Sequence, residues 1–242
     1  LIYLSYLSYF KTVRPKVVCL WNGHRLPEMA IKAAASRFNV KVAHFENGLI
    51  PNTTTMDFSG VNAFSSLPKD PAFYLQYAMN KQAVRVEKKL QARSPHKKRK
   101  GLVFEKFDFD QEYIFVPFQV NFDSQVIINS PRINSMVELY ESLEKALSVG
   151  IEASMLGKTV FVLGDACYGI KGVVTPVDSS AELISKINKM PEYAQDTELS
   201  NSFFNYLENE YLLPGAWQSE LNGVDSSHLA VFENKIGSRL VK

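Results

Sequence analysis

The segment KVVCLWNGHRLPEMAIKAAASRFNVKVAHFENG, residues 16–48, decides the fold class. It begins with the apolar run Lys16–Trp21, which predicts a buried strand. Pro27–Phe38 has a proline suited to a first helical turn, followed by alanines and spaced apolar residues, so it predicts a helix. Val40–Phe45 predicts a second strand. Strand, helix and strand in this order indicate a βαβ unit, and therefore an α/β fold.

Both predicted strands end in polar residues followed by glycine, at Asn22-Gly23 and at Glu46-Asn47-Gly48. In a βαβ unit these two strand ends lie on one rim of one sheet. Glu46 is a candidate base or sugar-hydroxyl acceptor facing a cleft, with the cap of a turn as the other interpretation. His44 precedes it by two residues in a strand, so both side chains point to the same face. A buried core histidine is the alternative to a catalytic one.

A further strand with a polar end lies in YIFVPFQVNFDSQVIINSPR, residues 113–132. Its first part, Tyr113–Phe118, is typical of a strand buried in a sheet. Ligands of open α/β sheets bind just beyond the carboxyl ends of such strands. Asp123 is the single carboxylate of the polar part and a candidate nucleophile or base, and Arg132 is a candidate anion clamp. An ordinary polar loop is the competing interpretation.

The rest of the chain is expected to alternate between helices, strands and one long loop. Polar, basic Ser94–Lys100 is the best linker candidate and divides the chain into residues 1–95 and 101–242. We expect a binding loop at Pro51–Pro71, a strand at Thr159–Leu163, and helices at Leu1–Thr12, Ala72–Gln91, Asn134–Leu147, Ser148–Gly157, Ser180–Lys189, Leu199–Leu213 and His228–Leu240.

Two of these predicted helices abut at Leu147 and Ser148 with no strand between them. Such a connection would leave a hole in the sheet, so we expect residues to be missing there, and also before Leu1. The start of the second helix, Ser148–Gly150, offers unpaired backbone N–H groups and a helix dipole that attract phosphate. A well-capped helix without a ligand explains the same pattern.

Composition restricts the function classes. The 242 residues are 46% hydrophobic and have a formal net charge of +2. This charge is too balanced to indicate a nucleic-acid-binding protein. No apolar run approaches the roughly 20 residues that a spanning helix needs. Cys19 and Cys167 are too few for a disulfide scaffold or a cysteine-rich metal site and favour a reducing, cytoplasmic setting. The basic segment Ser94–Lys100 leaves peripheral contact with anionic lipid as an alternative.

Several ordered blocks resemble the capsule polysaccharide synthesis family, which includes the bacterial retaining β-Kdo glycosyltransferases of capsule and lipopolysaccharide assembly. The blocks are WNGHRLPE (Trp21–Glu28), HFENGLIPNTT (His44–Thr54), DFSGVNAFSS (Asp57–Ser66), QVNFDSQ (Gln119–Gln125), SPR (Ser130–Arg132) and SVGIEASMLGKTVFVLGDACYG (Ser148–Gly169). The resemblance implies two Rossmann-like domains facing a cleft, as in the GT-B glycosyltransferases. A His-Pro motif of the family, expected between Leu147 and Ser148, is not in this sequence.

The resemblance also implies transfer of Kdo from CMP-Kdo, without a metal or cofactor, to a glycan or glycolipid acceptor such as O-antigen or a capsule linker. Other proteins of surface-polysaccharide assembly would be partners. Asp123 falls on the nucleophile and Glu46 lies near the acceptor, where Glu46 or a histidine would take the acceptor proton. We expect acceptor contacts at Asn22, His44, Asn47 and Asn52, and donor contacts at Gln119, Ser124, Gln125, Ser130, Arg132, Ser148, Val149, Gly150, Glu152 and Tyr168.

Retention of configuration follows from two inversions: a carboxylate attacks the anomeric carbon, and the acceptor hydroxyl then displaces it. Two other functions remain open from the sequence. One is an inverting transferase or a nucleotide-sugar epimerase on the same scaffold. The other is a non-catalytic module that binds glycan or takes part in its export.

Overall fold

The computed structural model describes residues 1–50, 53–81, 154, 157–187, 189–215 and 226–241, and every structural statement below concerns these residues. The strands are β1 (Val17–Trp21), β2 (Lys41–Asn47), β3 (Thr53–Asp57), β4 (Phe161–Leu163), β5 (Thr175–Val177) and β6 (Leu212–Pro214). The α-helices are α1 (Ile2–Val13), α2 (Leu26–Ser36), α3 (Pro71–Lys81), α7 (Ser180–Ile187), α8 (Thr197–Tyr206) and α9 (Ser226–Val241). Short 3₁₀ turns lie at Asn62–Phe64 and Met190–Tyr193, and a π-helical turn at Leu207–Tyr211.

The predicted βαβ unit is confirmed. Strands β1 and β2 pair in parallel, from Val17 opposite Lys41 to Trp21 opposite Phe45, and α2 connects them. Pro27 lies in the first turn of α2, where its missing N–H costs nothing. The apolar side of α2 is buried, with Ile31, Ala34 and Ala35 inside the core, as the spacing predicts.

The continuation of this sheet differs from the prediction in two places. Its strand order is β1-β2-β3-β6, and both β3 and β6 are antiparallel to their neighbours. The long loop predicted at Pro51–Pro71 is therefore wrong for Thr53–Asp57: its threonines are β-branched and fit a strand, although their hydroxyl groups suggest a loop. The helix predicted to Leu213 is wrong for Leu212–Leu213, because both leucines are buried in the sheet beside β3.

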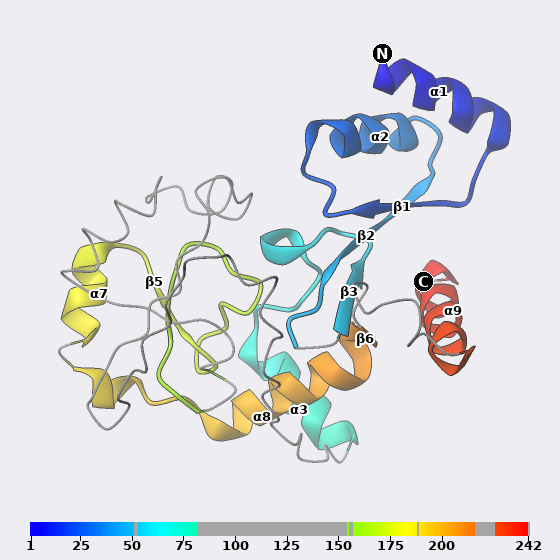
Figure 1. Ribbon diagram of the computed structural model, residues 1–242. Coiled ribbons are helices and arrows are strands. Elements are labelled where there is room, and N and C mark those ends of the chain that lie inside the picture. The colour runs from blue at the N-terminus through cyan, green and yellow to red at the C-terminus, as the bar shows by residue number, and fades with distance from the viewer. Residues whose placement is uncertain (51–52, 82–153, 155–156, 188, 216–225, 242) are drawn as a thin grey trace, which may run out of the picture.

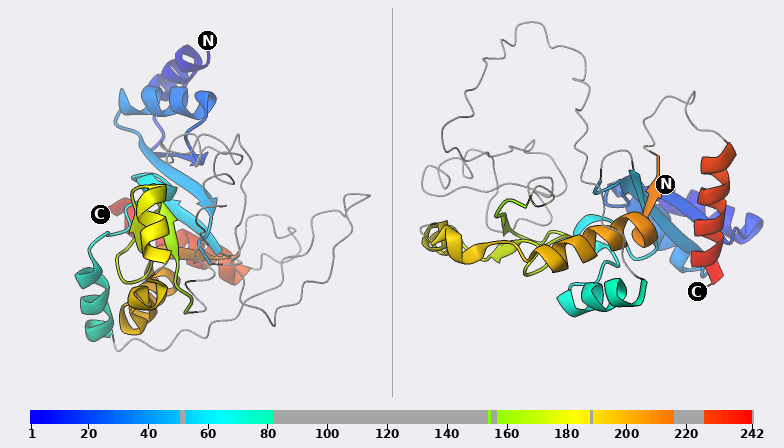
Figure 2. Two further views of the ribbon diagram at one scale, coloured as in Figure 1. Left: turned by 90° about the vertical axis from the view of Figure 1, so that its left-hand side faces the viewer. Right: turned by 90° about the horizontal axis from the view of Figure 1, so that it is seen from below.

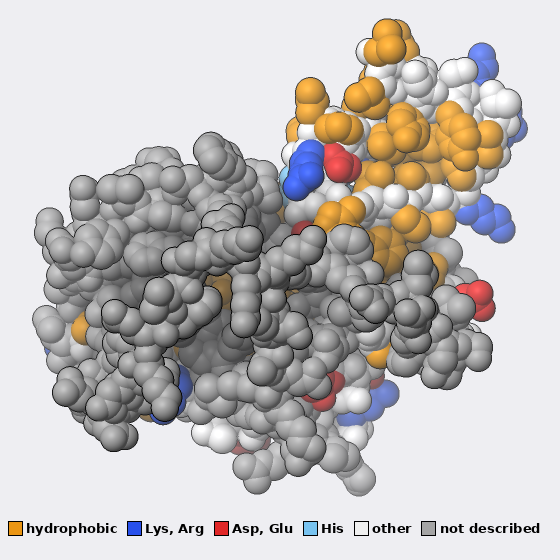
Figure 3. All heavy atoms as spheres, viewed as in Figure 1, with side chains coloured by type: hydrophobic (Ala, Val, Ile, Leu, Met, Phe, Trp, Pro, Cys, Tyr) orange, Lys and Arg blue, Asp and Glu red, His pale blue; other side chains and the backbone are white. Residues whose placement is uncertain are grey.

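Helices cover both faces of this four-stranded sheet (Figure 1). On one face, Phe10 of α1 and Ile31 of α2 pack with Leu20 of β1. On the other face, Ile236 of α9 packs against Ala43 and Met56. The result is a three-layer α/β/α arrangement, with helices on both faces of the mixed sheet. Figure 3 shows apolar side chains gathered over α1 and α2. Leu4 of α1 and Leu26 and Met29 of α2 are exposed.

A second region contains the parallel pair β4–β5 with α7, and α8 runs from it to the four-stranded sheet in both Figure 1 and Figure 2. The two regions share one core, since Ile50 and Leu67 belong to the same buried cluster as Val160, Ile170 and Phe203. Tyr74 of α3 is fully buried in this cluster and lies edge-on to Phe203 of α8, with ring centroids 5.1 Å apart. The aromatic spacing of α8 therefore serves the core, as its pattern predicts.

The C-terminal helix is predicted at His228–Leu240 and is confirmed as α9. Two of its basic side chains bind it to the rest of the protein. Lys235 Nζ donates to Leu212 O at 2.8 Å. The Arg239 guanidinium donates to Glu210 O and Tyr211 O at 2.7 and 2.8 Å, and also to Met56 O. The last carbonyls of a helix lack partners within that helix, so basic groups are favourable there. These contacts attach α9 to the end of the π-helical turn and to β3.

The described residues thus form a mixed α/β protein, in agreement with the predicted fold class at that level. The arrangement of two Rossmann-like domains and their boundaries at 1–95 and 101–242 depend on residues 82–153, which lie outside the described residues, and stay predictions. One observed feature bears on the boundaries: β6, near the end of the chain, completes the sheet that begins with β1.

Candidate functional site

The two polar strand ends meet, as predicted, on one rim of the sheet. Asn22 follows β1 in a left-handed conformation, with φ of 60°, which asparagine adopts more readily than most residues. Its backbone N–H donates to Phe45 O, and its Nδ2 donates to Glu46 Oε2, both at 2.8 Å. Glu46 Oε1 accepts from the backbone N–H of Asn47 at 2.9 Å. The rim therefore holds a half-buried carboxylate in a fixed orientation.

His44 lies on the same face of β2, two residues before Glu46, and is 2% exposed. Its Nδ1 is 3.2 Å from the backbone oxygen of Asp57. A carbonyl oxygen can only accept, so Nδ1 carries the proton of this hydrogen bond. Burial, followed by the positive charge of Lys32, lowers the pKa of His44. In the neutral imidazole, Nε2 then presents a lone pair, and this buried atom has no hydrogen-bond partner.

The depressed pKa of His44 predicts how stability depends on pH. The unfolded imidazole, with a pKa of about 6.5, binds a proton more readily than the folded one, so stability falls as pH decreases through that value. We expect the free energy of unfolding, measured with urea between pH 7.5 and 5.5, to fall less steeply in His44→Gln than in the original protein. The pKa of His24 is also lowered, so His24 contributes to the pH dependence of stability in both the variant and the original protein. Equal slopes would contradict this assignment.

Gly23 is the residue that allows this packing. Its φ is +86°, and a Cβ at this position would lie 2.6 Å from His44 Cδ2 and 3.2 Å from His44 Nε2. A side chain here would therefore be strained in its backbone and would also collide with the imidazole.

Gly23→Ala should lower the free energy of unfolding by about 1–3 kcal/mol, because it adds both backbone strain and a steric clash. Chemical denaturation measures the loss, and the His44 ring signals in NMR should shift. The matched control is Gly237→Ala, since a Cβ at Gly237 of α9 meets nothing within 4 Å. The control should be neutral or stabilising by up to about 1 kcal/mol. Equal stability of the two variants would contradict the contact.

A loop from β3 brings an aromatic ring to the rim. The Phe64 and His24 rings lie with centroids 4.9 Å apart and planes at 38°. The loop is held by Asp57, a buried carboxylate that accepts from Ser59 N and Ser66 N at 2.7 and 2.6 Å. Asp57 also accepts from the hydroxyls of Ser66 and Tyr211 at 2.7 and 2.8 Å. Asp57 is therefore a structural residue that fixes the position of Phe64.

Sequence reasoning did not single out Asp57, His24 or Phe64 as individual residues. A signal for Asp57 was present, because an aspartate two residues before a serine at a strand end is typical of a carboxylate that caps a turn. The contact between His24 and Phe64 joins residues 40 positions apart and leaves no local pattern.

The predicted site residues fall into three groups. Asn22, His44, Glu46 and Asn47 lie together at the rim. Tyr168 packs against the shared core, where burial raises its pKa to about 12, and its donor contact stays a prediction. The remaining predicted residues lie outside the described residues: Asn52, Gln119, Asp123, Ser124, Gln125, Ser130, Arg132, Ser148, Val149, Gly150 and Glu152.

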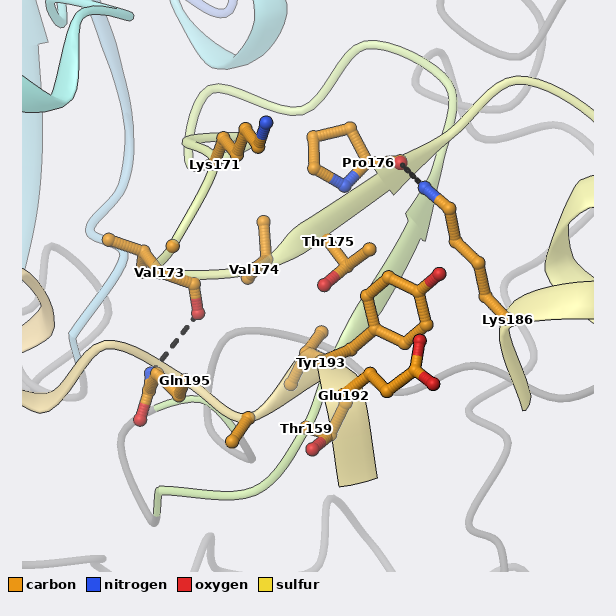
Figure 4. A pocket seen from close by; sticks show the side chains of 13 residues that line it. Thr159, Lys171, Val173, Val174, Thr175, Pro176, Lys186, Glu192, Tyr193 and Gln195 are labelled. Atoms are coloured by element: carbon orange, nitrogen blue, oxygen red, sulfur yellow. Dashed lines mark hydrogen bonds between the residues drawn. The ribbon is translucent and has the colours of Figure 1, made fainter. Parts of the chain in front are cut away.

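A cavity of about 580 Å³ lies elsewhere, beside the start of β4 and along β5 (Figure 4). Gln195 Nε2 already donates to Val173 O at 3.1 Å and to the Ser154 hydroxyl at 2.6 Å. Lys186 Nζ is 2.8 Å from the Glu182 carboxylate. These polar groups are occupied by one another, so the rim is the better candidate for a functional site.

Among the histidines, cysteines and acidic residues of the described ranges, no group of three or more has an arrangement that could hold a metal ion. None of the helices in the described part of the chain is long and apolar enough to cross a bilayer.

Comparison with known proteins shows a similarity for part of the chain. Residues 16–100 match the family model of the capsule polysaccharide biosynthesis protein, and this range contains the whole βαβ unit and its rim. Protein FixF of Sinorhizobium fredii is 26% identical to this chain over an alignment of 270 positions, gaps included, and this alignment covers 90% of the chain. The chain spans 65% of the length of FixF. No solved structure matches it. The chain is thus similar, over residues 16–100, to proteins of capsule polysaccharide biosynthesis.

Proposed function

We propose that this protein is a glycosyltransferase of bacterial surface-glycan synthesis that transfers Kdo from CMP-Kdo to a glycan or glycolipid acceptor with retention of configuration. One observation carries the proposal: Glu46, oriented by Asn22, and a neutral His44 lie on one face at the carboxyl ends of two parallel strands. Ligands of α/β sheets bind at such ends. The match of residues 16–100 to a capsule polysaccharide biosynthesis model supports the same class of chemistry.

The reaction would proceed in two displacements. The Asp123 carboxylate attacks the anomeric carbon of Kdo, the bond from that carbon to the phosphate oxygen breaks, and CMP leaves with the bonding electrons. A phosphate leaving group needs little protonation, so N–H donors and cations can stabilise it without a general acid. The acceptor hydroxyl then attacks the same carbon and Asp123 departs as a carboxylate.

The second step requires a base for the acceptor hydroxyl. Each oxygen of Glu46 accepts one hydrogen bond and has a second lone pair, and His44 Nε2 has a free lone pair. A base must lie within hydrogen-bond reach of the proton that it removes. Glu46 is half-buried, whereas His44 Nε2 is fully enclosed. We therefore assign the role of general base to Glu46 and an orienting role to His44.

A titration of CMP into the protein by calorimetry, followed by NMR of the transfer product, tests this function. Binding of CMP together with a β-Kdo product is the expected result. An α-Kdo product would indicate an inverting enzyme. Absence of both CMP binding and CMP-Kdo turnover would contradict the proposal and favour a non-catalytic glycan-binding module.

A further inference from the structure

Exposed apolar side chains concentrate on the first two helices. Of the twelve large hydrophobic residues that are exposed in the described part of the chain, nine lie between Leu1 and Phe38. Protein surfaces that gather so many large apolar groups usually contact a partner. Six of the nine belong to α1 and α2, and we name these six residues the α1–α2 surface: Ile2, Leu4, Tyr9, Val13, Leu26 and Met29.

The exposed residues of α1 follow the period of the helix. Ile2, Tyr9 and Val13 are 44%, 49% and 53% exposed, and successive members are seven and four residues apart, so they lie along one side of α1. Phe10, which is fully buried, attaches another side of the helix to the core. Packing therefore fixes α1 in place while a row of apolar side chains faces outward.

The start of α2 continues the apolar character. Leu26 and Met29 are three residues apart in its first turn, and they are 80% and 54% exposed. Figure 3 shows the apolar side chains of the two helices together on one face of the molecule. The α1–α2 surface is therefore a joint feature of both helices.

Basic residues dominate the same part of the chain. The whole chain has 27 basic and 25 acidic residues, but residues 1–45 contain a single acidic one, Glu28. The basic residues of this range number seven, and all except Lys32 are exposed: Lys11, Arg14, Lys16, Arg25, Lys32, Arg37 and Lys41. Figure 3 shows Lys and Arg side chains at the border of the apolar area. Positive charge thus surrounds the exposed apolar residues.

This combination matches the chemistry of an anionic lipid surface. Apolar side chains are stabilised at the boundary between headgroups and acyl chains, and neighbouring Lys and Arg side chains are attracted to acidic headgroups. Tyr9 suits the level of the headgroups, where an aromatic ring with a polar end is favourable. Helix α1 has 12 residues, far fewer than the roughly 20 of a spanning helix, so it would lie on the bilayer and not cross it.

A second copy of the chain fits the α1–α2 surface less well. In a symmetric dimer the same surface faces itself, so the seven basic residues of one copy would meet the same seven of the other. Like charges that face one another across an interface are unfavourable. Acidic headgroups would instead neutralise them.

We propose that the α1–α2 surface binds the face of an anionic phospholipid bilayer as a peripheral contact. The contact does not use the basic segment Ser94–Lys100. It is independent of the proposed sugar transfer. Leu26 follows the rim residue Asn22 by four positions, so the bound bilayer would lie beside the rim.

Flotation of the full chain with lipid vesicles tests the contact, with neither CMP-Kdo nor an acceptor present. Vesicles of equal parts phosphatidylcholine and phosphatidylglycerol should carry the protein up a density gradient. Vesicles of phosphatidylcholine alone should bind at least about tenfold less protein, because they lack the acidic headgroup. Sodium chloride should weaken binding to the anionic vesicles, because it screens their charge. Absence of flotation with anionic vesicles, or equal flotation with both, would overturn the proposal.

Substitutions of exposed apolar residues test which surface binds. Leu26→Gln with Met29→Gln should lower the partition coefficient for anionic vesicles at least about tenfold, because two apolar side chains no longer enter the bilayer. Ile2→Gln with Val13→Gln should have the same effect from α1. Met79→Gln, at an 82% exposed position of α3, is the control and should bind like the original protein. Unchanged binding by both double variants would overturn the proposal.

Substitutions of basic residues test the role of charge. Lys11→Gln with Arg14→Gln should lower binding to anionic vesicles at least about tenfold and leave the weak binding to phosphatidylcholine unchanged. Lys158→Gln with Lys171→Gln removes the same charge from exposed positions near β4 and β5. This control variant should bind like the original protein, and an equal loss in both would show that net charge alone matters and would overturn the proposal.

The basic segment Ser94–Lys100 is the competing membrane contact. Its charge is removed by changing four residues to glutamine: Lys97, Lys98, Arg99 and Lys100. The resulting protein should still float with anionic vesicles. Loss of flotation in this variant, with normal flotation of the α1 and α2 variants, would assign the contact to the segment and overturn the proposal.

Discussion

Glu46→Gln should lower kcat for sugar transfer by at least about 100-fold, in the range that a lost general base costs. The amide is nearly isosteric and can still accept from Asn22 Nδ2 through its one carbonyl oxygen, and it loses the hydrogen bond from the backbone N–H of Asn47. It cannot take a proton from the acceptor hydroxyl. Steady-state kinetics with CMP-Kdo measures the loss, and circular dichroism checks that the fold is retained.

Glu192→Gln is the control for this substitution, because Glu192 is exposed and lies far from the rim in sequence. It should have the activity of the original protein. A Glu46→Gln variant with kcat within about threefold of that value would remove Glu46 from catalysis and transfer the role of base to a histidine.

Asp57→Ala should lower the free energy of unfolding by at least about 3 kcal/mol, the largest stability effect we expect. The carboxylate is 3% exposed and accepts four hydrogen bonds, from Ser59 N, from the N–H and hydroxyl of Ser66, and from Tyr211. Alanine leaves all four donors without this acceptor, and the Tyr211 hydroxyl belongs to a buried residue. The Tyr211 contact also links the loop after β3 to the π-helical turn, so the substitution should destabilise both segments.

Urea denaturation measures this loss, and Asp57→Asn should fall between alanine and the original protein because it keeps one acceptor oxygen. Asp178→Ala, at an exposed position, is the control and should change stability by less than about 0.5 kcal/mol. An Asp57→Ala variant as stable as the Asp178→Ala control would show that the loop does not depend on this carboxylate.

The sequence predicts well what local periodicity determines. The βαβ unit between Lys16 and Gly48 has strong strand and helix patterns, and its two polar ends meet at the rim as expected. The pairing of His44 and Glu46 on one face follows from the alternation of a strand.

The sequence predicts poorly what distant contacts determine. Thr53–Asp57 has the composition of a loop, and its strand form depends on pairing with β2 and with β6, about 160 residues later in the chain. Gly48 shows the same dependence: a Cβ there would lie 1.8 Å from Thr53 Oγ1, so the hairpin into β3 requires glycine at this position. The tautomer of His44 likewise follows from Asp57 O across the sheet.

Intact mass measurement after brief incubation with CMP-Kdo tests the central claim most directly, that the rim serves a retaining transfer through Asp123. In Glu46→Gln the second displacement is slowed, so a covalent Kdo adduct should accumulate, and peptide mapping should place it on Asp123. The double variant with Asp123→Asn should show none. Sugar transfer by the original protein with no adduct in Glu46→Gln, or an adduct that persists without Asp123, would contradict the account.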